Sequence, residues 1–268
     1  MLLTIDVGNT EITIGLFAGD RIEEHWRLTT TGNRTPDEWA ATLTTHLVQA
    51  GHSANEVRAV VQASVAPAVT ESLAAGVEQA TGQRPANVTA ASKLPIRLDV
   101  DEPLTVGADR VVNTLAALEI YKRDTIVVDF GTATTFDCIV IDEPDSPAAT
   151  AGRFVGGVIA PGILTASDNL IRRTAKLPAT ELVAPRRAIG RRTEECIRAG
   201  VLFGTADATD GIVRRIKAVW PGSAVPFVVA SGGLAGLIAP LSKEIEKVDP
   251  FLTLVGLRIA AGHLGLKW

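Results

Sequence analysis

The chain has 268 residues, a net charge of −4 and 46% hydrophobic residues. This length suits one large domain or two of about 100–150 residues. The acidic balance and the lack of a long Lys/Arg cluster exclude a nucleic-acid surface, so no nucleic-acid partner is expected. Two cysteines, Cys138 and Cys196, lie far apart in apolar patterns, which is typical of reduced core residues in a cytoplasmic protein.

Membrane insertion is not expected either. Asp6 interrupts the N-terminal apolar run and no basic segment precedes it, which argues against a signal peptide. The longest uncharged stretch, from Pro221 to Ser242, is long enough to raise the question of a membrane span. Prolines and glycines divide it, so a strand, a Ser-Gly-Gly turn and a helix explain it better.

The first half of the chain predicts an α/β unit with a mixed sheet. Its apolar runs and turn residues give the order strand, strand, strand, helix, strand, helix. Thr35, Pro36 and Glu38 form a helix start with a capping box, and Trp39, Leu43, Leu47 and Val48 recur at helical spacing. The predicted elements are strands in residues 2–17 (a hairpin), 21–29 and 57–65, and helices over 36–50 and 67–80.

The second half predicts a similar unit. A Pro- and acid-rich connector over 94–106 leads to a helix over 111–121, and a second hairpin begins at Thr125. Residues 142–152 predict a long polar loop, and Thr193 is placed to cap a helix that extends to Trp220. Gly200 and Gly204 stand one helical turn apart, which fits either packing inside the monomer or a subunit interface. The other predicted elements are strands over 154–162 and 227–230, and helices over 164–175, 234–241 and 254–264.

The two hairpins share one design. Asp129-Phe-Gly-Thr132 follows a buried strand and precedes another, and Asp6-Val-Gly-Asn-Thr10 does the same. Glycine lets a turn approach a ligand, turn N–H groups and Thr hydroxyls can donate to phosphate, and a carboxylate can hold a cation. Two copies about half a chain apart indicate duplicated domains, 1–115 and 116–268, each with a phosphate hairpin. The alternative is chance similarity between two short hairpins.

Two further segments carry polar chemistry. Ser231-Gly232-Gly233 follows a buried strand and opens a helix, so it is a candidate adenosine contact, although tight strand–helix packing explains it as well. In Gly107-Ala108-Asp109-Arg110, a carboxylate placed to accept a hydroxyl proton stands beside an anion-binding guanidinium. A simple charge pair at a helix start is the alternative. The four histidines lack partners typical of a catalytic base, and neither a P-loop nor a Rossmann motif is present.

With these motifs, the chain resembles the type III pantothenate kinases of the acetate-kinase/sugar-kinase/Hsp70/actin superfamily. The resemblance covers nearly the whole length, and the motifs come in the family's order. It implies two duplicated actin-like (ribonuclease H-like) domains with mixed sheets flanked by helices. The segments that carry it are Asp6-Val-Gly-Asn-Thr10, Gly107-Ala-Asp-Arg110, Asp129-Phe-Gly-Thr-Ala-Thr-Thr135, Gly156-Gly-Val-Ile-Ala-Pro-Gly162 and Ser231-Gly-Gly-Leu-Ala235.

The resemblance implies ATP-dependent phosphorylation of pantothenate, the first step of coenzyme A synthesis, with Mg²⁺ and a homodimer whose substrate site lies near the subunit interface. It assigns Asp109 as the general base and Asp129 to a monovalent cation, K⁺ or NH₄⁺. The residues that it places against ATP are Asp6, Val7, Gly8, Asn9, Thr10, Glu11, Ile12, Thr13, Thr132, Ser231, Gly232 and Gly233. Those that it places against pantothenate are Val100, Gly107, Ala108, Asp109, Arg110 and Thr193.

Some positions depart from the family's pattern. Val100 stands where a tyrosine is usual, so an aromatic wall of the vitamin pocket is missing. Ser231 replaces a threonine but keeps the hydroxyl, and Gly190-Arg-Arg-Thr193 is more basic than usual. Two other interpretations therefore stay open: a non-catalytic relative that acts as an accessory factor in transcription, and a kinase for another small hydroxyl substrate. The presence of Asp6, Asp109 and Asp129 together favours a catalyst.

Overall fold

The computed structural model describes residues 1–142 and 150–268. The chain forms two compact units: unit 1 holds Met1–Ile120, residues 150–151 and Leu252–Trp268, and unit 2 holds residues 121–142 and 152–251. The last helix is thus part of unit 1, whereas a division after residue 115 assigns it to the second half. The long loop expected over 142–152 lies mostly outside the described residues.

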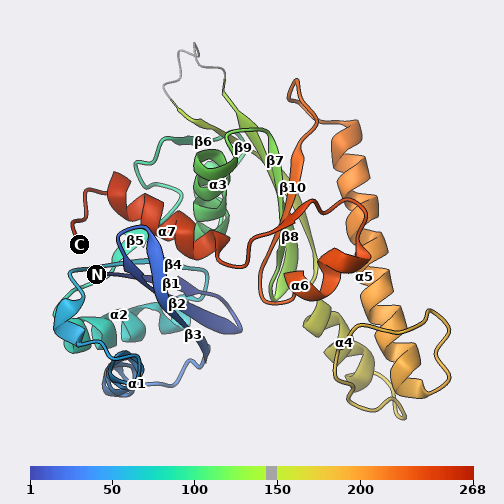
Figure 1. Cartoon of the computed structure of the whole chain (residues 1–268), viewed down its shortest axis with the longest axis horizontal. Coiled ribbons are helices and arrows are strands. Elements are labelled where there is room, and N and C mark those ends of the chain that lie inside the picture. The colour runs from blue at the N-terminus through green and yellow to red at the C-terminus, as the bar shows by residue number, and fades with distance from the viewer. Residues whose placement is uncertain (143–149) are drawn as a thin grey trace. The chain divides into compact units, whose positions relative to one another are not determined.

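Unit 1 is built on a mixed five-stranded sheet in the order β3-β2-β1-β4-β5 (Figure 1). The first two strands form the predicted hairpin, and β1 also pairs in parallel with β4, with Val7 opposite Ser64. Every residue from Ala59 to Ala63 is buried, which explains the nearly all-apolar sequence of β4. The strands are β1 (Leu2–Val7), β2 (Glu11–Ala18), β3 (Arg21–Thr29), β4 (Ala59–Ser64) and β5 (Ala86–Val88).

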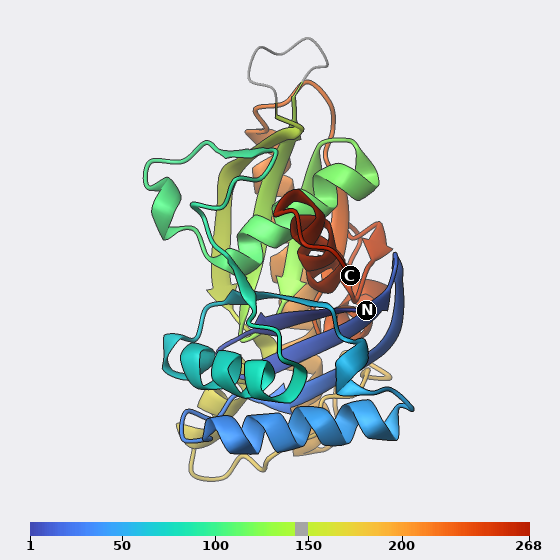
Figure 2. The ribbon, with the colours of Figure 1, turned by 90° about the vertical axis from the view of Figure 1, so that its left-hand side faces the viewer.

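Two neighbouring helices of unit 1, α1 (Pro36–Gln49) and α2 (Pro67–Thr81), pack in the same core as β1 and β2 (Figure 2). The predicted capping box is present, since Glu38 N donates to Thr35 Oγ1 and Thr35 N donates to the Glu38 carboxylate. Val48 is 65% exposed, so its predicted place in the buried stripe is wrong: it lies at the edge of the stripe, beside Leu47.

The remaining elements of unit 1 include two longer helices, of which α7 packs against β1, β2 and β4. Short strands and 3-10 turns interrupt the connectors, and the sequence patterns did not predict them. These elements are α3 (Ala108–Tyr121, ending in unit 2), α7 (Leu252–His263), the strand β6 (Ile96–Leu98) and the turns η1 (Ala54–Glu56) and η2 (Pro103–Thr105).

Unit 2 repeats the hairpin-plus-parallel-strand plan. Its strands lie in the order β11-β10-β7-β8-β9, with β7 antiparallel to β8 and parallel to β10. As predicted, the segment around Asp129 is a strand, a turn and a returning strand. The strands are β7 (Thr125–Phe130), β8 (Ala133–Ile141), β9 (Gly152–Pro161), β10 (Phe227–Ser231) and β11 (Lys247–Val248).

The helices of unit 2 share a core with its strands, and they correct three expectations. Thr193 is the first residue of α5, and the N-cap position belongs to Arg192, without a side-chain cap. The helix expected over 234–241 is divided into two short turns, α6 and η3. Cys196 is exposed, while Cys138 is buried as expected. The elements are α4 (Ile163–Arg172), α5 (Thr193–Ala218), α6 (Ala235–Ile238) and η3 (Ala239–Leu241).

Candidate active site

In unit 1, the predicted phosphate segment Asp6–Thr13 forms the end of β1, the turn and the start of β2. The turn closes on itself, because Gly8 N donates to Glu11 O at 3.0 Å. Thr30, just after β3, braces it from the side. Its N donates to Thr10 O at 2.9 Å and its Oγ1 donates to Gly8 O at 2.7 Å. The turn is therefore held in one conformation from two sides.

Asp109 lies at the same edge of unit 1 as this turn. It stands in the first turn of α3, directly after Gly107 and Ala108. A Cβ on Gly107 would lie 3.5 Å from Val65 Cγ1, and Val65 N donates to Val7 O at 3.0 Å. The start of α3 thus reaches the carboxyl ends of the parallel strands β1 and β4, where α/β sheets commonly bind ligands.

The environment of Asp109 suits a base. Burial raises the pKa of its carboxyl group above the ordinary value, and this outweighs the opposing effects of the hydrogen bond from Arg110 N and of the Arg110 charge. That hydrogen bond, 2.8 Å from Arg110 N to Asp109 Oδ1, fixes the side chain against the helix start. A carboxylate with a raised pKa binds a proton more readily than an exposed one, as a general base must.

In unit 2, two predicted site segments meet at the ends of parallel strands. Asp129 of β7 lies opposite Ser231 of β10 in the register of the pair. The next residue, Gly232, has φ +88°, and a Cβ there would overlap Asp129 Oδ1 and would lie 2.7 Å from Phe130 O. Only glycine fits this turn without strain. The Ser231–Gly232 backbone is thus pressed against Asp129.

The hairpin turn after Asp129 has its own brace. Gly131 N donates to Ala133 O at 3.1 Å, and Thr165 Oγ1 of α4 donates to Thr132 O at 2.8 Å. Gly162 packs so closely that a Cβ there would overlap Thr132 O. The sequence analysis placed Gly162 in a motif but did not predict its contact with the hairpin turn, and it missed both Thr30 and Thr165, because each acts on a turn far away in sequence.

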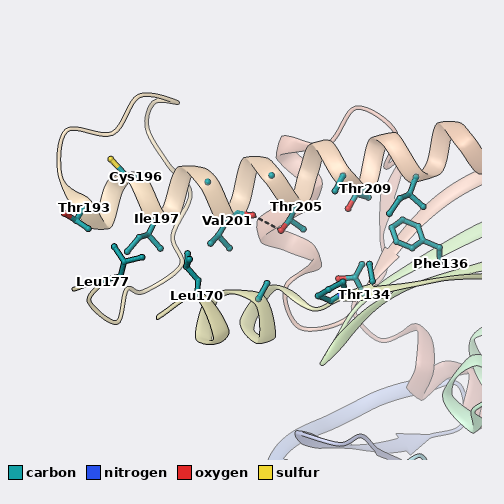
Figure 3. A pocket seen from close by; sticks show the side chains of 17 residues that line it. Thr134, Phe136, Leu170, Leu177, Thr193, Cys196, Ile197, Val201, Thr205 and Thr209 are labelled. Carbon is teal, nitrogen blue, oxygen red and sulfur yellow. Dashed lines mark hydrogen bonds between the residues drawn. The ribbon is translucent and has the colours of Figure 1, made fainter. Parts of the chain in front are cut away.

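A cavity of about 600 Å³ lies in unit 2 between α4, α5 and the ends of β8 and β9 (Figure 3). Thr193 lines one end of it, and Thr134, just past the hairpin turn, lines the other. Thr134 Oγ1 is buried and has no hydrogen-bond partner in the described chain. The other lining side chains are mostly apolar. Of the predicted substrate residues, Thr193 is the one in this cavity, while Val100 lies half-buried in the connector before η2.

The described residues hold no group of three or more His, Cys, Asp or Glu that would bind a transition metal. The Asp129 carboxylate and the Phe130 carbonyl both lie next to the Gly232 turn. Oxygen ligands of this kind suit hard cations, so these residues fit the cation that the family resemblance assigns to Asp129. Among the helices of the described chain, none is long and apolar enough to cross a bilayer.

The fold defines a class of protein. A putative 2-dehydro-3-deoxygalactonokinase from Sinorhizobium meliloti aligns with 98% of this chain and 97% of its own, at a TM-score of 0.58 and 12% identity. A putative Baf family transcriptional activator from Campylobacter jejuni aligns with 98% of both chains, at a TM-score of 0.57 and 16% identity. Together with the repeated hairpin sheets, these similarities confirm the predicted fold of two duplicated actin-like domains with mixed sheets flanked by helices.

Sequence similarity then gives the family. The family model for type III pantothenate kinase matches residues 2–215. Two proteins named type III pantothenate kinase align with 97% of this chain. The protein from Moorella thermoacetica is 44% identical, and the alignment covers 98% of its length. The protein from Thermomicrobium roseum is 42% identical, and the alignment covers 96% of its length. The chain belongs to the type III pantothenate kinase family, and is therefore an enzyme of the phosphotransferase class.

Proposed function

We propose that this enzyme transfers the γ-phosphoryl group of ATP to pantothenate, giving 4'-phosphopantothenate, the first committed product on the way to coenzyme A. The observation that carries the proposal is the placement of Asp109. Its pKa is raised by burial, and it stands at the strand ends beside the braced Asp6–Thr13 turn. A proton acceptor next to a phosphate-binding turn is what phosphoryl transfer to a hydroxyl group needs.

In the proposed reaction, Asp109 accepts the proton of the pantothenate primary hydroxyl. The hydroxyl oxygen attacks the γ-phosphorus, the bond from that phosphorus to the β–γ bridging oxygen breaks, and ADP leaves. The Asp6–Thr13 segment and Thr132 donate to the phosphates, and Mg²⁺ supplied with ATP would neutralise their charge. Ser231, Gly232 and Gly233 contact the adenosine through their backbone; α6 has only four residues, so the turn itself makes the contact.

Asp129 is proposed to hold K⁺ or NH₄⁺ rather than Mg²⁺. The Phe130 carbonyl oxygen lies at the same Gly232 turn, and a carboxylate together with a neutral carbonyl is a ligand set that suits a hard cation. A monovalent cation there would offset phosphate charge without tight coordination.

Pantothenate is proposed to bind at the start of α3. Gly107 and Ala108 bring the backbone close to the substrate, and the Arg110 guanidinium attracts its carboxylate. Val100 presents a smaller side chain than the usual tyrosine, which widens this part of the pocket. Thr193 contributes a hydroxyl from the cavity beside α5.

We infer that two copies of the chain associate through the face of α5 that lines this cavity. A Cβ on Gly200 or Gly204 would meet no atom of the described chain within 4 Å, so packing inside the monomer does not explain the two glycines. Leu164 and Leu170 of the adjacent α4 are 52% and 41% exposed. A second copy would cover this apolar face. Light scattering should give a dimer, and Gly204→Glu a folded monomer; a monomeric wild type would contradict the inference.

Product analysis with a substrate panel tests the proposed function. Purified protein is incubated with ATP, Mg²⁺ and K⁺, and with pantothenate, N-acetylglucosamine or glucose as acceptor, and the products are identified by mass spectrometry. Phosphorylation of pantothenate alone is expected. Phosphorylation of a sugar instead would favour the small-hydroxyl kinase, and a folded protein that binds ATP without turnover would favour the accessory factor.

A further inference from the structure

Asp210 is a buried acid that the proposed chemistry does not use. It stands in the middle of α5 and is 4% exposed. Its carboxylate accepts hydrogen bonds from Ser242 Oγ at 2.5 Å, Lys243 N at 2.9 Å and Glu244 N at 3.2 Å. All three donors come from one short stretch, residues 242–245, called here the anchor segment. Hydrogen bonds to a carboxylate in a buried site are stronger than those between neutral groups.

The anchor segment is fixed by further contacts. Ser242 Oγ also accepts from Glu244 N and Ile245 N, both at 3.2 Å, so the segment closes around the hydroxyl. The Glu244 carboxylate pairs with Lys217 Nζ of α5 at 2.8 Å and with Arg214 at 3.6 Å. Asp210 is the buried part of this attachment, and the ion pairs lie nearer the surface.

The anchor segment is the far end of the proposed adenosine-binding stretch. Ser231-Gly232-Gly233 leads into α6 and η3, and Ser242 comes directly after them. These two helical pieces are one turn each, too short to keep a fixed orientation by their own hydrogen bonds. On the near side the turn is held by β10, paired with β7 through Ser231 and Asp129. On the far side, Asp210 holds residues 242–244 on α5, and the next residues return to the sheet, where Glu246 N donates to Val228 O at 2.9 Å.

We propose that Asp210 is a positioning residue for the nucleotide. By holding the anchor segment on α5, its carboxylate keeps α6 and η3 in place and so holds the Ser231–Gly233 turn open for adenosine. This inference rests on the proposed use of that turn for ATP. It predicts an effect on nucleotide binding but not on the start of α3, where pantothenate is proposed to bind.

The test compares two buried carboxylates of unit 2. Asp210→Asn keeps the shape but removes the negative charge that strengthens all three hydrogen bonds, and its amide NH₂ in the place of Oδ2 cannot accept from Lys243 N. Asp124→Asn is the matched control: Asp124 is 3% exposed and accepts from Trp220 Nε1 at 2.8 Å and Ile141 N at 3.0 Å. Both variants lose a buried charged acceptor. The partners of Asp124 lie outside the adenosine-binding stretch, so only Asp210→Asn weakens the attachment of the anchor segment.

The expected result is a rise of about tenfold in the KM for ATP in Asp210→Asn, with the KM for pantothenate unchanged. Asp124→Asn should lower the melting temperature but leave both KM values unchanged. Should Asp210→Asn not fold, Ser242→Ala removes one donor and should raise the KM for ATP about threefold. An unchanged KM for ATP in the folded variant, or an equal rise for both substrates, would overturn the inference.

Calorimetric titration with ATP separates this inference from the proposed function. Wild-type protein that binds ATP but does not phosphorylate pantothenate would contradict the proposed substrate only. If the ATP dissociation constant is then weakened in Asp210→Asn but not in Asp124→Asn, the role of Asp210 holds. Equal ATP affinity in wild type and Asp210→Asn would overturn it whatever the acceptor is.

Discussion

The two hairpins of this protein have the same design and different surroundings. Each ends a strand with Asp-x-Gly, returns antiparallel, and has a parallel strand on its other side, β4 for β1 and β10 for β7. Each turn is braced by residues that come after the third strand: Thr30 after β3, and Gly162 and Thr165 after β9. The brace is therefore part of the repeated plan.

The two units differ in the residue directly after the parallel strand. After β4 comes Val65, which lies against Gly107 and so places the partly buried Asp109 near the turn. After β10 comes Gly232, whose left-handed backbone is pressed against Asp129. One hairpin thus has a partly buried carboxylate beside it, and the other has a backbone turn beside a carboxylate. We infer that the repeated plan binds phosphate, while the neighbouring residues divide the tasks of proton transfer and nucleotide binding.

The largest expected effect comes from removing the proposed proton acceptor of unit 1, Asp109. Asp109→Asn should lower kcat by about 10²–10⁴-fold, the usual contribution of a general base. Its melting temperature should not fall, because burial of the charged carboxylate destabilises the wild type. ADP release and thermal melts measure both. Glu119→Gln, an acid near the far end of the same helix, is the control and should keep full activity; normal turnover in Asp109→Asn would refute the base assignment.

Next in size is the loss of the glycine that distinguishes the unit 2 turn. Gly232→Ala puts a Cβ into a left-handed backbone and against Asp129, so it should cost about 2–5 kcal/mol of unfolding free energy and abolish measurable ATP binding. Denaturant melts and ATP titration test this. Gly51→Ala is the control, because Gly51 has a similar φ of +82° but, in the described chain, open space where the Cβ would be added. It should cost only about 1–2 kcal/mol of unfolding free energy. Equal costs would contradict the close packing.

A pH series should show the raised pKa of Asp109 in two ways. The value of kcat/KM should fall on the acid side at a pH above the ordinary carboxyl range, because the base is protonated there. The folded state also disfavours the charged carboxylate, so Asp109→Asn should be more stable than wild type at neutral pH. This advantage should shrink as pH falls through the raised pKa and vanish below the ordinary pKa. A stability difference that does not change with pH would argue against a desolvated carboxylate.

The smallest effect is expected from the brace of the first hairpin. Thr30→Val keeps the shape but removes the hydrogen bond from Oγ1 to Gly8 O, which should cost about 0.5–1.5 kcal/mol and raise the KM for ATP about threefold. Steady-state kinetics against ATP and pantothenate measure the change. Thr45→Val, which removes a hydroxyl bonded within α1, serves as the control. An equal effect of both would mean that Thr30 has no special link to the turn.

Much of the local structure could be predicted from the sequence, because it depends on neighbouring residues. The capping box at Thr35 places the start of α1, and the Asp-x-Gly turns place both hairpins. The Asp129 and Ser231 segments lie side by side in unit 2, because they end adjacent parallel strands. Glycine at position 232 reports a real constraint that the structure explains through Asp129.

The features that could not be predicted depend on contacts between distant residues. Thr30 and Thr165 look like ordinary threonines until the third strand brings each to a hairpin turn. Asp210 stands in a helix among polar residues, and only the fold shows that it is buried and bonded to residues 242–244. The exposure of Val48 and Cys196 could not be predicted for the same reason: an apolar pattern along a helix does not specify how wide a face of the helix its neighbours cover.

The most direct test of the central claim is the rate of pantothenate-dependent ADP formation by the purified protein, measured with potassium and with sodium as the added cation. The proposal that the two hairpins bind ATP, with Asp109 as base and a monovalent cation at Asp129, predicts turnover that requires both pantothenate and potassium. Turnover that is equally fast in sodium would contradict the cation site. A folded protein that binds ATP and forms no ADP with pantothenate in potassium would contradict the proposed function itself.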